Sequence, residues 1–180
     1  MARSKAKVED SEGAADITTI KAPGFFASKG APTRTVVPDG GYVFSIKSVK
    51  ASRSKNDDGS NISVAFEVID VKEDRNANQI GSLVYENLYF MDSDHKDYEK
   101  KLSNGGYQRD ISINNARAIV NATKIKVKEE DDENILKVIQ KTVGKTLCAT
   151  AKKVEDKQSD SGFVNRFSRW SEDKDADKDA

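Results

Sequence analysis

The residues that most often carry catalysis or hold metals are scarce in this chain. Its 180 residues include one cysteine, Cys148, and one histidine, His95. A structural zinc site needs about four Cys or His ligands, and a single cysteine forms no internal disulfide. A nucleophilic Cys–His pair stays arithmetically possible. However, Cys148 lies in the run 146–151, which is typical of a strand, so we interpret it as a small buried side chain.

His95 lies in a polar, acidic stretch that favours a solvated histidine at the start of a helix. The alternative is a metal-dependent nuclease centre that uses Asp92, Asp94 and His95, although nothing in the sequence fixes the third and fourth ligands of a metal there. Gly144-Lys145-Thr146 resembles the end of a phosphate-binding loop, but that loop needs a strand before it and a helix after it. Here a predicted helix precedes the tripeptide and a strand follows. We therefore expect no metal, no cofactor and no enzymatic activity.

A more informative pattern combines cationic and aromatic residues in predicted strands and hairpins. Single-stranded nucleic acid is bound by cationic grooves along its phosphates and by rings on which bases stack, at about 1–3 kcal/mol per base. The sequence supplies both kinds of residue. The candidate DNA-binding residues are Lys47, Lys50, Arg53, Lys55, Tyr85, Lys152, Lys153, Arg166, Arg169 and Trp170.

Turn residues and alternating apolar residues predict the elements that position these side chains. Pro38-Asp39-Gly40-Gly41 is typical of a turn that leads into a strand. Period-two alternation is strongest over residues 61–71. Gly81 is interpreted as a bulge in the third strand. The predicted strands cover residues 42–50, 61–71, 80–90, 147–154 and 162–170.

Between the third and fourth strands the period changes to that of helices. We predict a short helix over 95–102, a second capped by Ser112 and running over 113–120, and a third over 135–143 after the acids at 129–133. The order β-β-β-α-β-β is that of an OB-fold, a five-stranded Greek-key barrel, here with a helical insert. Other five-stranded barrels and α+β sheets share the same order.

Alternation also predicts which rings of the last strand are exposed. If Phe163 and Phe167 enter the core, Arg166 and Trp170 face outward together. In the third strand, alternation does not decide which of Tyr85, Tyr89 and Phe90 is exposed.

Composition indicates flexible polar segments around a modest core. Apolar residues make up 36% and charged residues 33%, and the net charge is zero. We predict a flexible arm over 1–33 containing Phe25-Phe26, a folded domain over 34–170, and a disordered acidic tail over 171–180. The tail has five acids and two lysines, hence a net charge of −3, which leaves +3 for the rest. No apolar run is long enough to span a membrane and no secretion signal opens the chain, so a cytoplasmic location is expected.

Several short motifs resemble the small single-stranded DNA-binding proteins of bacteriophages, which are built on an OB-fold. The similarity covers about residues 37–170. It rests on Val37-Pro38-Asp39-Gly40-Gly41-Tyr42, on Val64-Ala65-Phe66-Glu67-Val68-Ile69-Asp70, on Gly81 before Val84-Tyr85-Glu86-Asn87-Leu88, on Gly144-Lys145, and on Asn165-Arg166-Phe167. The resemblance implies binding and protection of single strands in replication or recombination, without catalysis. It suggests Lys47, Tyr85, Lys152, Arg166 and Trp170 as members of the binding face.

The acidic tail also resembles those by which replication proteins of this kind dock polymerases, helicases or nucleases. Its candidate partner-binding residues are Glu172, Asp173, Asp175, Asp177 and Asp179. The tail departs from the bacterial pattern because it ends Lys178-Asp179-Ala180, with no terminal aromatic residue. Electrostatic docking of replication or recombination proteins, competition of the tail for the basic groove, and homo-oligomers all stay open.

The sequence thus predicts a non-enzymatic protein that coats single-stranded DNA, in the cytoplasm of a host cell if phage-encoded. The alternative is a virion or assembly component, in which the barrel is a protein-interaction module. Salt-sensitive DNA binding distinguishes the two.

Overall fold

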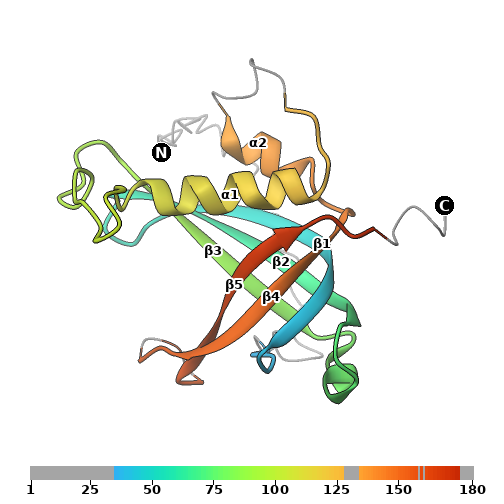
Figure 1. Ribbon diagram of the computed structural model, residues 1–180. Coiled ribbons are helices and arrows are strands. Elements are labelled where there is room, and N and C mark those ends of the chain that lie inside the picture. Colours follow the sequence, from blue (N-terminus) through green and yellow to red (C-terminus); the bar gives the residue numbers. More distant parts are fainter. Residues whose placement is uncertain (1–34, 128–133, 158, 160, 175–180) are drawn as a thin grey trace, which may run out of the picture. The chain divides into compact units, whose positions relative to one another are not determined.

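A computed structural model describes residues 35–127, 134–157, 159 and 161–174, which fold mainly into β-strands (Figure 1). The five strands pair antiparallel in the order β3-β2-β1-β4-β5. The predicted mainly β class with five strands is confirmed. The strands are β1 (Gly40–Arg53), β2 (Gly59–Val71), β3 (Leu83–Met91), β4 (Thr146–Glu155) and β5 (Phe163–Ser171).

Three short helices join the strands. A 3-10 helix, η1 (Asp74–Gln79), lies between β2 and β3, whereas α1 (Asp110–Ala122) and α2 (Ile135–Gln140) lie between β3 and β4. Helix α1 packs against β3 and β5. The predicted arm with Phe25-Phe26 and the acids at 129–133 lie outside the described residues.

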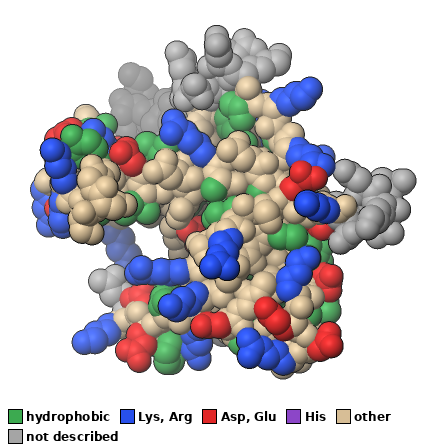
Figure 2. All heavy atoms as spheres, in the orientation of Figure 1, with side chains coloured by type: hydrophobic (Ala, Val, Ile, Leu, Met, Phe, Trp, Pro, Cys, Tyr) green, Lys and Arg blue, Asp and Glu red, His purple; other side chains and the backbone are tan. Residues whose placement is uncertain are grey.

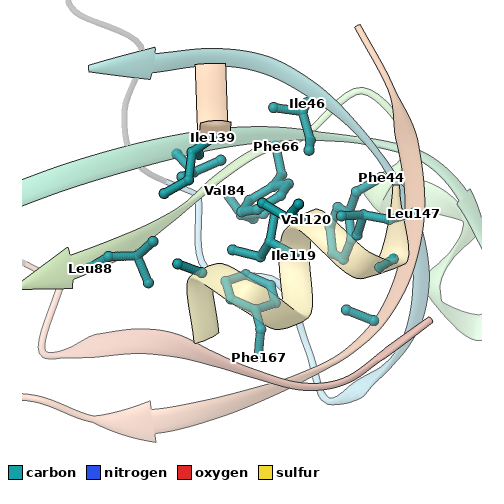
Figure 3. Close-up of a cluster of buried hydrophobic side chains, with 14 of the residues drawn as sticks. Phe44, Ile46, Phe66, Val84, Leu88, Ile119, Val120, Ile139, Leu147 and Phe167 are labelled. Atoms are coloured by element: carbon teal, nitrogen blue, oxygen red, sulfur yellow. The ribbon is translucent and has the colours of Figure 1, made fainter. Parts of the chain in front are cut away.

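The core forms where the strands turn one face toward α1 (Figure 3). Ile62, Val64, Phe66 and Val68 of β2 are all buried, so the predicted alternation is confirmed there. The rings of Phe44, Phe66 and Phe167 contact one another at centroid distances of 5.6 to 5.8 Å. Aromatic pairs at such distances add about 0.5–1.5 kcal/mol to the burial of their area. These rings therefore join β1, β2 and β5 within the hydrophobic core.

An irregularity in β1 decides which of its residues are buried. Ile46 pairs with Phe66 and Ser48 with Ala65, so Lys47 is an extra residue in the ladder. Regular alternation after Ile46 would point Ser48 and Lys50 into the core. The bulge instead turns Val49 inward, where it packs against the core, and leaves Lys50 exposed.

A second irregularity, in β5, overturns the predicted orientation of Trp170. Thr150 pairs with Ser168 and Cys148 with Ser171, so β5 gains a residue, and Arg169 has a φ of 54°. The Trp170 ring consequently lies on the core side, 5.6 Å from Phe167 and 5.7 Å from Phe66 between centroids. Trp170 and Arg166 do not face outward together.

Gly81 is a bulge where the chain enters β3, as predicted: its φ is 86°, it donates to the Val68 carbonyl, and Val68 donates to the Ser82 carbonyl, so two residues oppose Val68. Two other predicted details of the loops are wrong. Residues 95–102 form turns and no helix. Ser112 does not cap α1, because its buried hydroxyl accepts the backbone N–H of Tyr89 at 2.9 Å.

The third predicted helix is shorter than expected. It ends at Gln140, and Val143 is exposed in the turn that follows. There Gly144, with a φ of 81°, donates to the Ile46 carbonyl, and Ile46 donates to the carbonyl of Lys145. Gly144-Lys145-Thr146 is therefore the passage from α2 into β4, as its sequence context indicates.

A short extended segment before β1 contacts both edge strands of the sheet. The backbone N–H of Thr35 donates to the carbonyl of Leu83 in β3 at 3.2 Å. The Asn165 side chain of β5 both accepts from the Val37 N–H, at 2.9 Å, and donates to the Val37 carbonyl, at 2.8 Å. Residues 35–37 thus link β3 to β5 at one end, while α1 packs on both strands.

Replacing the central ring tests this account of the core. We expect Phe66→Ala to lower the free energy of unfolding by about 3–5 kcal/mol, because the cavity removes contacts with two other rings and with Trp170. Urea unfolding measures it. Ile80→Ala is the control: its side chain is 53% exposed, and we expect a change within about 0.5 kcal/mol. Equal losses in the two variants would contradict the account.

Candidate nucleic-acid interface

The face of β1, β2 and β3 that points away from the core carries mostly small residues, a lysine and two tyrosines, Tyr85 and Tyr89. Strand pairing sets Lys50, Ser63 and Asn87 side by side, and in the next row Ser48, Ala65 and Tyr85. We call these six residues the outer face. Tyr85 is half-buried, and small side chains stand beside it in its row. An aromatic ring among Ser, Asn and Lys side chains offers both elements of single-strand binding.

The structure also places the other rings of β3. Phe90 packs against the core, so it is unavailable for stacking. Tyr89 lies on the side of Tyr85, but its hydroxyl donates to the Asp58 carboxylate at 2.7 Å. Tyr85, the ring of β3 among the predicted DNA-binding residues, lies in the row of Ala65 on the outer face.

The three predicted lysines of β1 and of the β1–β2 hairpin differ in their surroundings. Lys47, at the bulge, is half-exposed and its Nζ lies 2.8 Å from a Glu67 carboxylate oxygen. Lys50 and Lys55 are exposed, on β1 and in the β1–β2 hairpin. Exposed ion pairs contribute about 0–1 kcal/mol, so a phosphate can replace Glu67 as the partner of Lys47 at little cost.

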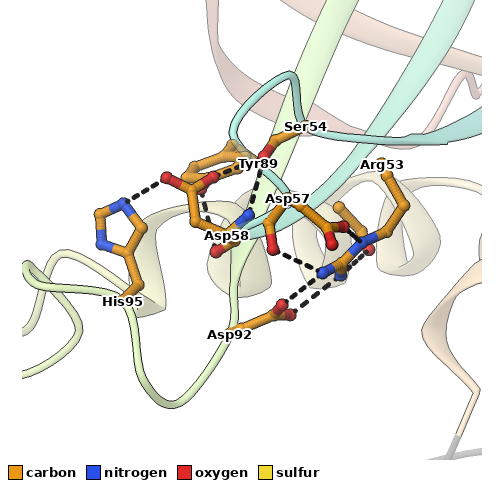
Figure 4. A network of polar contacts seen from close by, with 8 residues as sticks. Arg53, Ser54, Asp57, Asp58, Tyr89, Asp92 and His95 are labelled. Carbon is orange, nitrogen blue, oxygen red and sulfur yellow. Dashed lines mark hydrogen bonds and ion pairs between the residues drawn. The ribbon is translucent and has the colours of Figure 1, made fainter.

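Arg53 positions the β1–β2 hairpin (Figure 4). Its guanidinium donates to Asp57 and to Asp92, each at 2.7 Å. These hydrogen bonds raise the pKa of Arg53 above its ordinary value. Two carboxylates already compensate the charge of Arg53, so it contributes more to the shape of the hairpin than to phosphate binding.

Asp58 is the centre of a second set of contacts in the same hairpin (Figure 4). Ser54 and Tyr89 donate to one of its carboxylate oxygens, and Nε2 of His95 lies 3.4 Å from the other. Hydrogen bonds from Ser54 and Tyr89 lower the pKa of Asp58 to about 2. Gly59 permits this approach, since a Cβ there would lie 2.7 Å from the Tyr89 ring. The hairpin is therefore fixed to the segment after β3.

His95 is not the solvated side chain that the sequence predicts. Its side chain is 9% exposed, and its Nδ1 accepts the backbone N–H of Asp97 at 3.0 Å. With Asp58 at the other nitrogen, neither nitrogen is left to activate Cys148, which lies in β4 opposite Val43. Asp92 binds Arg53, and nowhere in residues 35–127, 134–157, 159 and 161–174 do three or more His, Cys, Asp or Glu side chains gather as metal ligands.

The β4–β5 hairpin brings together four of the other predicted cationic residues. Lys152 pairs with Arg166 across the strands, and both are exposed. The Nζ of Lys153 lies over the Phe163 ring, 4.0 Å from its centroid. Arg169 is exposed at the β5 bulge. Figure 2 shows Lys and Arg side chains on both sides of the recess between this hairpin, below, and the segment after β3, at the left.

A half-buried carboxylate, Glu86, lies behind this cationic surface. Glu86 of β3 accepts a hydrogen bond from Asn115 of α1 at 3.2 Å. Burial raises the pKa of Glu86 to about 7, although Asn115 and the positive charge of Arg166 act in the opposite direction. The sequence did not predict this position: Glu86 lies between the buried apolar residues Val84 and Leu88, on the side of β3 that faces the core.

The beginning of the acidic tail is part of the folded domain. Ser171 is the last residue of β5, and Glu172 forms an ion pair with Lys124 after α1. Glu172 and Asp173 line a cavity of about 400 Å³ with Lys124, Gly144 and Lys145. Glu172, whose side chain is 40% exposed, is thus held at the folded domain by this ion pair. Asp175, Asp177 and Asp179 lie outside the described residues.

Sequence reasoning missed one cluster, in the segment between β3 and α1. The guanidinium of Arg109 lies between the rings of Tyr98 and Tyr107. Two tyrosines in a stretch with Lys96, Lys100 and Lys101 were the available signal.

Comparison with family models finds none that matches this chain, and comparison with curated proteins finds no match either. Among the described residues, the helices are all too short or too polar to cross a membrane.

The raised pKa of Glu86 predicts a pH-dependent stability. In the folded state the Glu86 carboxyl keeps its proton up to about pH 7, whereas in the unfolded chain it loses the proton near the ordinary pKa of 4.5. The free energy of unfolding is therefore unaffected by this group below about pH 4.5 and decreases as the pH rises from there toward 7. We expect Glu86→Gln to gain about 1–3 kcal/mol relative to the wild type between pH 5 and pH 8. Urea unfolding at both values measures this gain. Glu155→Gln, which removes an exposed carboxylate of β4, is the control. A difference between Glu86→Gln and wild type that is the same at both values would refute it.

Proposed function

We propose that this protein binds single-stranded DNA with little sequence preference, along the outer face and between the β1–β2 and β4–β5 hairpins. The observation that carries the proposal is the setting of Tyr85, a half-buried ring in a row with Ser48 and Ala65 and next to the row of Lys50. Bases stack on the ring, and phosphates follow Lys47, Lys50 and Lys55. Lys152 and Arg166 extend this path on the β4–β5 hairpin.

The strand order supports an OB-type Greek-key barrel for this role. In that fold the face of the second and third strands binds the ligand, and the first and last hairpins flank it. Here β1 is shared by β2 and β4, and α1 packs on both edge strands, β3 and β5. The cationic residues lie on the two hairpins that the fold places beside that face.

The biological role follows from the resemblance to the phage single-stranded DNA-binding proteins. We propose that the protein coats and protects single strands in replication or recombination, in the cytoplasm, without covalent chemistry. The acids at 172–179 would compete with DNA for the cationic surface, and would bind replication or recombination proteins when DNA displaces them.

Binding measured across a salt series tests this function. We expect a labelled oligo-dT to bind tightly at low salt in fluorescence anisotropy, to weaken steeply as salt rises, and to be preferred over duplex DNA. An RNA strand of the same length measures the preference between single-stranded DNA and RNA. If oligo-dT does not bind at low salt, the proposal fails and a protein-interaction module is the better explanation.

Two variants assign the binding to the outer face. We expect Tyr85→Ala to weaken oligo-dT binding by about 5- to 150-fold through the loss of a stacked base. Lys50→Ala should reduce the slope of log K against log salt by about 0.7, which corresponds to one phosphate contact. Lys137→Ala, on α2 and away from this face, is the matched control. Equal affinities of Tyr85→Ala and the control would place the strand elsewhere.

A further inference from the structure

Three residues between β3 and α1 form a stack that the proposed function does not include. The guanidinium carbon of Arg109 lies 4.6 Å from the centroid of the Tyr98 ring and 4.1 Å from that of Tyr107. The same guanidinium donates to the Tyr98 carbonyl at 3.0 Å and to Glu99 at 2.5 Å. Arg109 thus holds both rings in one orientation, and all three residues are half-buried.

The backbone around this stack is closed on itself. Lys101 and Tyr107 form a β-bridge, Gln108 donates to the Lys100 carbonyl at 2.9 Å, and Leu102 donates to Gly106 at 2.7 Å. The turn between them contains Gly105, with a φ of 87°. Rings fixed by such a small hairpin lose little conformational freedom when a ligand binds.

The stack does not serve the hydrophobic core. Within residues 35–127, 134–157, 159 and 161–174, the buried apolar core contains Leu88 and then Ala116 along the chain, and nothing between them. The two tyrosines lie instead beside lysines: Lys96, Lys100 and Lys101 are exposed, and the Nζ of Lys101 lies 6.0 Å from the centroid of Tyr107. Rings next to exposed cations, outside a core, have the composition of a single-strand contact.

The same segment is tied to the hairpin that borders the outer face. The backbone of Asp92 donates to the Asp58 carbonyl at 3.1 Å, its carboxylate binds Arg53, and His95 contacts Asp58. β3 leads directly from Tyr85 into this segment, and Tyr85 lies seven residues, or about 23 Å, before Asp92 at the rise of a strand. A single strand that follows β3 past Asn87 therefore runs toward the segment that contains the stack.

We propose that Tyr98, Tyr107 and Arg109 form a second stacking site, which binds a base of the same single strand several nucleotides beyond the one on Tyr85. This inference rests on the proposed function. It implies a strand site longer than the outer face alone, within the range of about 4–16 nucleotides found for OB-folds.

Oligonucleotides of two lengths test the second site. We expect Tyr107→Ala to weaken binding of dT16 by about 5- to 100-fold, to change binding of dT5 much less, and to be rescued by Tyr107→Phe, which keeps a ring. Ile80→Ala, at the other end of β3, should bind both lengths like the wild type. Equal dT16 affinity in Tyr107→Ala and Ile80→Ala would overturn the second site, whereas a wild type that binds neither length would overturn the proposed function itself.

Photocrosslinking separates contact from a structural role of the ring. Wild-type protein irradiated with a 16-mer containing 5-iodouracil should give peptide adducts at Tyr98 or Tyr107 as well as at the outer face. Adducts confined to the outer face would contradict the second site, even if Tyr107→Ala bound more weakly.

Discussion

The structure depends on β1, the strand that forms backbone hydrogen bonds with both β2 and β4. From Tyr42 to Ser45, β1 pairs with β4 on one edge and with β2 on the other, whereas from Ser48 to Arg53 it continues with β2 alone. The change occurs at Ile46, where Gly144 and Lys145 make the last backbone hydrogen bonds to that edge. The bulge at Lys47 lies at this point. Both the apolar core and the polar outer face follow from it, because burial of Lys50 would cost far more free energy than one interrupted ladder.

The same device is used a second time at the other end of the sheet. In β5 an extra residue allows Phe167 and Trp170, three positions apart, to pack on the same rings. The chain thereby places its only tryptophan against the core, whereas Tyr85, Tyr98 and Tyr107 are half-buried. A tyrosine suits a half-buried position, since its ring is apolar and its hydroxyl polar.

The sequence pattern predicted those features that depend on neighbouring residues, and it did not predict those that depend on contacts between distant residues. Alternation over residues 61–71 identified β2 because one face of that strand packs entirely on the core. The orientation of Trp170 could not be predicted, because it depends on a positive φ at Arg169. Arginine rarely adopts a positive φ, so the sequence does not indicate the bulge there. The hairpin contacts were equally hidden: Arg53 and Asp92 are 39 positions apart, and Tyr89 and Asp58 are 31 apart. For the candidate site, the sequence indicated which residue types are present. The pairing of strands that are distant in sequence determines which of these residues share a face.

The short segment before β1 has a consequence for how copies of this protein behave toward one another. β3 and β5 are the edges of the sheet, and an edge with unpaired backbone groups is a template for strands of other molecules. The Thr35 N–H donates to a carbonyl at the start of β3. The side-chain amide of Asn165 exchanges two hydrogen bonds with the Val37 backbone, as the backbone of a neighbouring strand would. With α1 packed on the same two strands, the fold restricts edge-to-edge aggregation. In the proposed coating role, many copies would lie on one DNA strand at high local concentration, where that protection matters most.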